Sequence, residues 1–317
     1  MSSGSSISSS RSEAQASLRP QSFRLGEKII IGFLFATAAL SVAVTTAIVF
    51  SLFIPLPEFF SQVSITEFFT ATVWAPSFAN PSFGVLPVVA GTLQVVMYSM
   101  LVAVPLGLAS AIYLSEYASN GVRKTIKPVL EVLEGIPTVA TGLFALFWLR
   151  PFIENLTPWL PWESPFSIGV AGVAVGFIII PLIASVSDDA MRSVPRSLRE
   201  GAYALGATKM RVAIKVVLPA AISGVVAAFV LGASRAVGET MVVLLVAGGG
   251  NPQLVWGFTE ASSAMTAFIA ARATGEIATG TLDYYTIFAV GSLLFVMTLI
   301  MNAIAIRFVN RFREVYE

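Results

Sequence analysis

The fold is decided by the stretch from Arg192 to Val246, which reads RSVPRSLREGAYALGATKMRVAIKVVLPAAISGVVAAFVLGASRAVGETMVVLLV. Its first part, up to Lys215, is polar and basic. Its second part is a long apolar run that contains Arg235 and Glu239. Another apolar run precedes the stretch. A polar segment between two long apolar runs is typical of a loop that joins two membrane spans.

The composition supports a membrane protein. Of the 317 residues, 56% are hydrophobic and 12% are charged, whereas soluble domains contain about 25% charged residues. The chain has no cysteine and no histidine, so disulfides, thiolate chemistry, the usual metal ligand and the usual general base are all missing. We therefore expect no metal site, no cofactor in this chain and no catalytic residues. The net charge of +1 gives no general attraction to nucleic acid.

Six apolar segments are predicted to cross the membrane, since a span needs about 20 residues. The fold class expected is an all-α integral membrane protein, with residues 1–28 as a disordered cytoplasmic tail and 29–317 as the transmembrane domain. The third span is irregular because GIPT, residues 135–138, interrupts it. The six predicted spans are residues 29–54, 85–113, 129–149, 166–186, 216–246 and 284–308.

The positive-inside rule orients these spans. Of the 19 lysines and arginines, only Arg150 and Arg272 fall in segments expected outside, and only Arg235 lies in the interior of a span, since Arg307 falls at the inner end of span six and counts with the tail. The remaining 16 lie in the two tails, in the loop between spans two and three, and in the loop between spans four and five. This division predicts that both termini are cytoplasmic.

The loop between spans four and five has a helical pattern. Leu198, Ala202 and Leu205 recur at helical spacing, and basic side chains occupy the opposite face. Gly206 permits a sharp turn, and Pro219 suits the start of the next helix. We predict a short helix, a turn, and the entry to span five. The alternative is an ordinary solvated loop of positive charge.

A longer pattern runs through this loop. Glu200, Gly201, Ala202, Gly206 and the V-x-L-P at 216–219 give E-G-A-x₃-G-x₉-V-x-L-P. This resembles the EAA loop of ABC importer permeases, E-A-A-x₃-G-x₉-I-x-L-P, with two small changes that keep the spacing. The resemblance implies that the loop is a coupling helix that seats in a cleft of a cytoplasmic ATPase. The residues expected at this seat are Glu200, Gly201, Ala202 and Gly206, with Arg199 and Lys209 at its rim.

Two further strings narrow the resemblance. SRAVGETMVVLLVAG at 234–248 and GIPTVATGLFALFWL at 135–149 are similar to the phosphate-specific ABC importer permeases of the PstC type. The resemblance implies the type I importer permease fold, in a bacterial plasma membrane. It also implies four kinds of partner: a second, homologous permease, two ATPase subunits, an external phosphate-binding protein, and inorganic phosphate itself. The chain has no G-x₄-GK[ST] string, so ATP and Mg²⁺ would be bound by the ATPase partner.

The charges within the spans are candidate substrate-path residues. Arg235 and Glu239 have i,i+4 spacing and would share one helix face. A charge at the bilayer centre costs from ~2.5 to more than 10 kcal/mol, so they would face a partner or a water-filled path. An intrahelical ion pair or a snorkelling arginine is the structural alternative. The functional one is an oxyanion site, because the arginine fork binds oxyanions bidentately.

Glu131 and Glu134 lie near the inner end of span three. Both could lie at the membrane interface beside Lys127. In the other interpretation, Glu134 lines the inner exit of the path, where an acidic group would help to expel an anion.

The function expected is the permease subunit of an ATP-driven phosphate importer. An importer of another oxyanion, such as sulfate or molybdate, is the near alternative, because selectivity would lie largely in the binding protein. A secondary transporter or channel is a distant one, since no inverted repeat is evident. An intramembrane enzyme is disfavoured, since Asp188 and Asp189 are adjacent and not on facing spans.

Overall fold

The protein, in a computed structural model, is described for residues 25–249, 252–275 and 277–311. It divides into two compact units, Met1–Ile54 and Pro55–Glu317. The described part is mostly helical, which confirms the predicted all-α class. The predicted tail at 1–28 lies mostly outside the described residues, so its disorder stays a prediction.

The first unit contains α2, Leu25–Phe53. This 29-residue helix covers the first predicted span, and within its unit nearly all its side chains are exposed. At about 1.5 Å per residue, α2 is longer than the ~30 Å hydrocarbon core.

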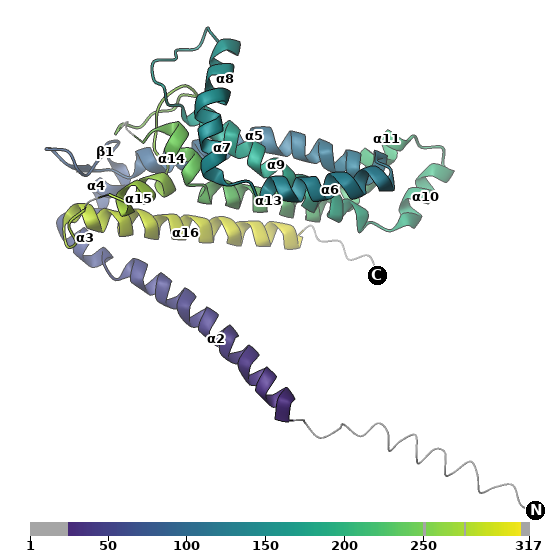
Figure 1. The fold of residues 1–317 in the computed structure, drawn as a ribbon, viewed down its shortest axis with the longest axis horizontal. Coiled ribbons are helices and arrows are strands. Elements are labelled where there is room, and N and C mark those ends of the chain that lie inside the picture. Colours follow the sequence, from purple (N-terminus) through teal and green to yellow (C-terminus); the bar gives the residue numbers. More distant parts are fainter. Residues whose placement is uncertain (1–24, 250–251, 276, 312–317) are drawn as a thin grey trace, which may run out of the picture. The chain divides into compact units, whose positions relative to one another are not determined.

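The second unit contains all the other elements (Figure 1). In chain order they are α3 (Leu56–Gln62), α4 (Ile65–Thr70), β1 (Trp74–Ala75), β2 (Ser82–Phe83), α5 (Leu86–Ile112), η1 (Tyr113–Tyr117), α6 (Asn120–Glu134), α7 (Thr138–Phe144), η2 (Ala145–Leu149), α8 (Arg150–Leu156), α9 (Ile168–Arg192), α10 (Arg196–Ala204), α11 (Lys209–Val212), η3 (Ala213–Val217), α12 (Leu218–Ala220), α13 (Ile222–Gly238), α14 (Met241–Ala247), α15 (Met265–Ala273) and α16 (Leu282–Arg311). The segments η1, η2 and η3 are single π-helical turns, and β1 and β2 form an antiparallel pair.

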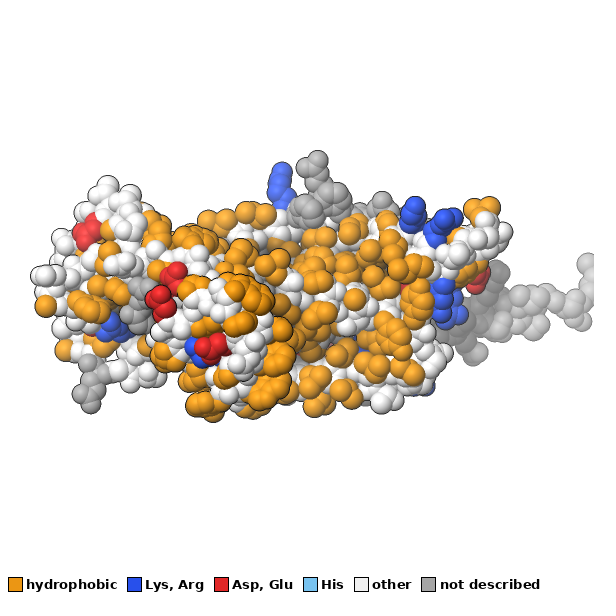
Figure 2. All heavy atoms as spheres, turned by 90° about the horizontal axis from the view of Figure 1, so that it is seen from above, with side chains coloured by type: hydrophobic (Ala, Val, Ile, Leu, Met, Phe, Trp, Pro, Cys, Tyr) orange, Lys and Arg blue, Asp and Glu red, His pale blue; other side chains and the backbone are white. Residues whose placement is uncertain are grey.

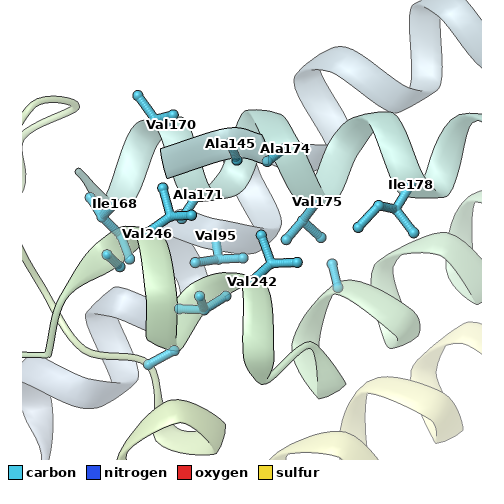
Figure 3. Packing of buried hydrophobic residues seen from close by; sticks show 14 of the residues in the cluster. Val95, Ala145, Ile168, Val170, Ala171, Ala174, Val175, Ile178, Val242 and Val246 are labelled. Atoms are coloured by element: carbon cyan, nitrogen blue, oxygen red, sulfur yellow. The ribbon is translucent and has the colours of Figure 1, made fainter. Parts of the chain in front are cut away.

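The core of this unit is built on α5 and α9, which lie side by side (Figure 1). Glycines allow the two helices to approach closely. A Cβ atom on Gly172 would lie 2.6 Å from Tyr98 Cβ, and one on Gly176 would lie 2.9 Å from the Ser99 carbonyl oxygen. Val95 of α5, Val175 of α9 and Val242 of α14 then contribute to one buried cluster (Figure 3).

A second buried cluster lies at the end of the unit that carries β1. It joins α3, α4 and the strands to α15 and α16 through aromatic side chains. Phe59 packs edge-to-face on Phe68, and Trp74 packs likewise on Phe268. The aromatic residues of 55–84 are therefore partly core residues.

The third predicted span, 129–149, is bent, and its first residues lie in a helix that begins earlier. Residues 129–134 belong to α6, an amphipathic helix that begins at Asn120. The segment from Thr138 to Leu156 follows after a bend of 88°. The predicted interruption at GIPT is confirmed as this bend. Pro137 disfavours the helical conformation at Ile136 and has no N–H to continue the helix, so α6 ends before it.

The fifth predicted span, 216–246, is not one helix. The segment Lys209–Ala220 is bent by 74° from α13 at Ala221. A second break at Glu239 separates α13 from α14, because Glu239 has an extended backbone. The predicted turn into span five, placed at Pro219, therefore lies two residues before the observed bend at Ala221. By contrast, α9 continues to Arg192, six residues beyond the predicted end of span four.

Four helices in the described residues, α2, α5, α9 and α16, are each long and apolar enough to cross a membrane. Six spans result if each bent pair counts as one. The middle of the face in Figure 2 is mainly hydrophobic, and Lys and Arg side chains gather at the end of the second unit that carries α10 and α11.

Candidate anion and coupling sites

The structure brings Arg235 and Glu134 together from two different spans. Arg235 lies in the last turn of α13, and Glu134 is the last residue of α6. The Arg235 Nη1 donates to Glu134 Oε1 at 2.8 Å, and its Nη2 donates to the Glu134 carbonyl oxygen at 3.3 Å. The two side chains are 32% and 33% exposed. They therefore form a half-open ion pair at the point where both spans are broken.

Glu239 takes a different part in this site. Its Oε1 accepts hydrogen bonds from the backbone N–H groups of Thr240 at 3.2 Å and Val242 at 3.4 Å. The carboxylate thus caps the N-terminus of α14, where a negative charge is favourable. The Thr266 hydroxyl donates to the Glu239 carbonyl oxygen at 2.7 Å. The intrahelical Arg235–Glu239 pair does not form, since α13 ends between the two residues and Arg235 pairs with Glu134 instead.

The two glutamates of α6 have separate environments. Glu131 is exposed, whereas Glu134 turns to Arg235. Lys127, which the sequence placed beside both glutamates, donates to Asp189 Oδ1. The two glutamates therefore differ in their contacts, and whether Glu134 lines the inner exit of the path stays a prediction.

A charge cluster that the sequence did not reveal joins α6 to the C-terminal end of α9. Asp188 is fully buried, and its Oδ2 accepts from Arg123 Nε at 3.0 Å and Nη2 at 2.7 Å. Its Oδ1 accepts from Arg192 Nε at 3.3 Å. Removing one partner from a buried ion pair costs about 3–5 kcal/mol, so this cluster fixes α6 on α9. The available signal was an aspartate at the end of an apolar run with an arginine at i+4.

The coupling segment has the predicted helix and turn. After α10, Gly206 adopts φ +77°, and the Ala207 N–H donates to the Ala202 carbonyl oxygen at 3.1 Å. Leu205 is 89% exposed, and Glu200 and Gly201 are also exposed.

Arg199 and Lys209, expected at the rim of the seat, are instead engaged within the chain. Arg199 donates to Glu116 Oε1 from Nε at 3.2 Å and from Nη2 at 3.0 Å. It also donates to the carbonyl oxygens of Val194 and Met191. Lys209 Nζ lies 5.0 Å from the ring centroid of Tyr117. Arg199 therefore holds α10 against η1 and α9 through hydrogen bonds within the chain.

These features together define a class of protein. Two bent helix pairs each contribute one residue to a half-open arginine–carboxylate ion pair, and an exposed helix and turn lies at one end of the second unit. This arrangement is that of a membrane transport permease. The chain belongs to the family of binding-protein-dependent transport system inner membrane components, which matches residues 103–314, and it is a PstC-type permease.

Two relatives align with this chain over most of their own length. The probable ABC transporter permease protein YqgH of Bacillus subtilis is 34% identical over 288 residues, which are 90% of this chain and 91% of YqgH. The phosphate transport system permease protein PstC of Mesorhizobium japonicum is 30% identical over 313 residues, 93% of each chain.

Solved structures of ABC transporters share the fold. A bacterial ABC transporter that imports alginate matches with a TM-score of 0.58 at 17% identity, over 91% of this chain and 100% of that chain. The MetNI methionine ABC transporter matches with a TM-score of 0.52 at 20% identity, over 73% of this chain and 95% of that chain. At these identities the likeness establishes the type I importer permease fold alone.

Proposed function

We propose that this chain is the permease subunit of an ATP-driven phosphate importer and forms half of its translocation path. The PstC phosphate permeases among its relatives support the substrate. Its partners would be a second permease, two ATPases that bind ATP and Mg²⁺, and an external phosphate-binding protein. Both termini would be cytoplasmic. No observation favours sulfate or molybdate, a secondary transporter or a channel.

The observation that carries the proposal is the position of Arg235. It lies where two broken spans meet, it is one-third exposed, and its ion-pair partner among the described residues is Glu134. The planar fork of arginine binds oxyanions bidentately, so the guanidinium would bind phosphate on its way through. Glu134 would return to Arg235 after release, and Glu239 would hold the start of α14 in place.

The exposed end of the unit would supply the motor contact. The segment from Glu200 to Gly206 would seat in the ATPase through its exposed residues Glu200, Gly201 and Gly206, with Leu205 at its tip. Ala202 packs inward against a buried cluster and would support the seat from within. Arg199 would hold the seat on the permease through Glu116 rather than contact the ATPase.

Replacing Arg235 with glutamine is expected to reduce phosphate uptake about tenfold or more, because charge-assisted hydrogen bonds contribute ~1.5–3 kcal/mol. Phosphate uptake by Arg235→Lys should lie between that of the wild type and that of Arg235→Gln, since lysine keeps the positive charge but cannot bind an oxyanion bidentately. The measurement is radiolabelled phosphate uptake in a strain that lacks its own importer, with complex assembly checked by co-purification.

Arg272→Gln is the matched control. Arg272 also forms an ion pair, with Asp283 at 3.1 Å, and the two side chains are 26% and 25% exposed. Because this pair lies away from the break in span five, uptake should stay within twofold of wild type. Wild-type uptake in Arg235→Gln would exclude the proposed anion site.

A further inference from the structure

We propose that the Arg235–Glu134 ion pair is a latch that phosphate opens, and that α6 carries this event to the coupling helix. Substrate occupancy would then control ATP hydrolysis through contacts inside this chain. The inference rests on the proposed function and adds a route of communication to it.

The first step is competition for one guanidinium. Arg235 gives Nη1 to the Glu134 carboxylate and Nη2 to the Glu134 carbonyl oxygen. A phosphate bound bidentately needs the same N–H groups. Its charge would also repel the Glu134 carboxylate. Phosphate and the end of α6 are therefore alternative ligands of Arg235.

The second step is the weak hold on the end of α6. None of the residues of α6, all of which the structure describes, is buried. The helix ends at Glu134, and the 88° bend begins at the next residue. Arg235 contacts both the carboxylate and the last carbonyl group of the helix, which is the favourable place for a cation. Loss of this contact frees the C-terminal end of α6.

The third step is the firm hold on the rest of α6. Arg123 binds the buried Asp188, and Lys127 binds Asp189, so α6 is fixed to the last turns of α9. Arg199 donates to the Met191 and Val194 carbonyl oxygens at the end of the same helix and thereby holds α10 there. The N-terminal half of α6, which leads to the latch at Glu134, and the coupling helix are thus attached to one element, the C-terminal end of α9.

These three steps imply reciprocal coupling. Suppose that phosphate at Arg235 shifts the equilibrium of the coupling helix between two positions by some factor. The affinity for phosphate must then differ between those two positions by the same factor. ATP-driven movement would return Glu134 to Arg235 and thereby displace the anion. Communication between site and motor then needs no straight helix through the break at Ala221.

The test is ATP hydrolysis by the purified complex with its binding protein, measured with and without inorganic phosphate. In Glu134→Gln the latch is open without substrate, so phosphate-free hydrolysis should rise severalfold. The ratio of the rates with and without phosphate should fall to near one. Glu134→Asp keeps the charge on a shorter side chain and should give an intermediate ratio, which tests the latch if the glutamine variant does not assemble.

Glu131→Gln is the control, since Glu131 lies on the same helix one turn earlier and forms no ion pair within the described residues. It should keep the wild-type ratio. A second variant, Arg123→Gln, leaves Asp188 its Arg192 partner but loosens α6. In this variant, the rate of ATP hydrolysis without phosphate should stay low, and added phosphate should no longer raise it.

Two results would overturn the inference: a wild-type ratio in Glu134→Gln would exclude the latch, and a wild-type ratio in Arg123→Gln would exclude the route through α6. Neither result touches the proposed function, which stands or falls on uptake by Arg235→Gln. Loss of uptake in Arg235→Gln together with an unchanged ratio in Glu134→Gln would reject the latch alone.

Discussion

Replacing Gly206 with valine is expected to abolish phosphate uptake while the chain remains in the membrane. Gly206 adopts φ +77°, and a Cβ atom there would meet nothing within 4 Å. The left-handed conformation costs an L-residue about 1–2 kcal/mol, and a β-branched residue is a marked outlier in it. Valine should therefore change the backbone path of the turn and reorient Leu205. The segment would then no longer fit the ATPase subunit proposed to bind it.

The measurement for Gly206 is phosphate uptake beside the amount of chain in isolated membranes. Gly201→Ala is the control, because Gly201 lies five residues earlier in α10, has open space around it without a positive φ, and corresponds to an alanine of the EAA pattern, so the substitution keeps the seat. Alanine is also a better helix former than glycine, so uptake should be kept. Normal uptake in Gly206→Val would contradict the assignment of this turn to the motor contact.

The turn at Gly206 was predictable because its causes are local. Helical spacing before the glycine and the special backbone of the glycine itself lie within a few residues of sequence. The break at GIPT was predictable for the same reason, since Pro137 acts on its own neighbours. Local signals of this kind also located most of the apolar helices.

The partner of Arg235 was not predictable in the same way. The i,i+4 rule pairs it with Glu239 only if the helix continues, and no proline marks the break between them. Its actual partner, Glu134, is 101 residues away in sequence. The position of that partner depends on two bends whose angles no local pattern fixes.

The buried charge cluster shows the same limit. A polar run at 187–192 after an apolar helix reads as a loop, because charged residues are rarely buried unless paired. Asp188 is paired, with Arg123 from 65 residues earlier, and the helix therefore continues to Arg192. The sequence contains both residues but not their proximity, which arises only when α6 packs on α9.

Replacing Gly176 with leucine is expected to destabilise the protein, so that most of it no longer accumulates in the membrane. A Cβ atom at this position would lie 2.9 Å from the Ser99 carbonyl oxygen and 3.0 Å from Val102 Cβ. Because the nearer atom belongs to the backbone of α5, the helices must separate, at a cost of about 3 kcal/mol or more. Immunoblots of membranes should show the loss, whereas Gly32→Leu, with nothing within 4 Å, should accumulate normally. Normal accumulation of Gly176→Leu would mean that α5 and α9 do not need close contact. Close packing of these two helices would then not be what stabilises the core that positions the anion site and the coupling helix.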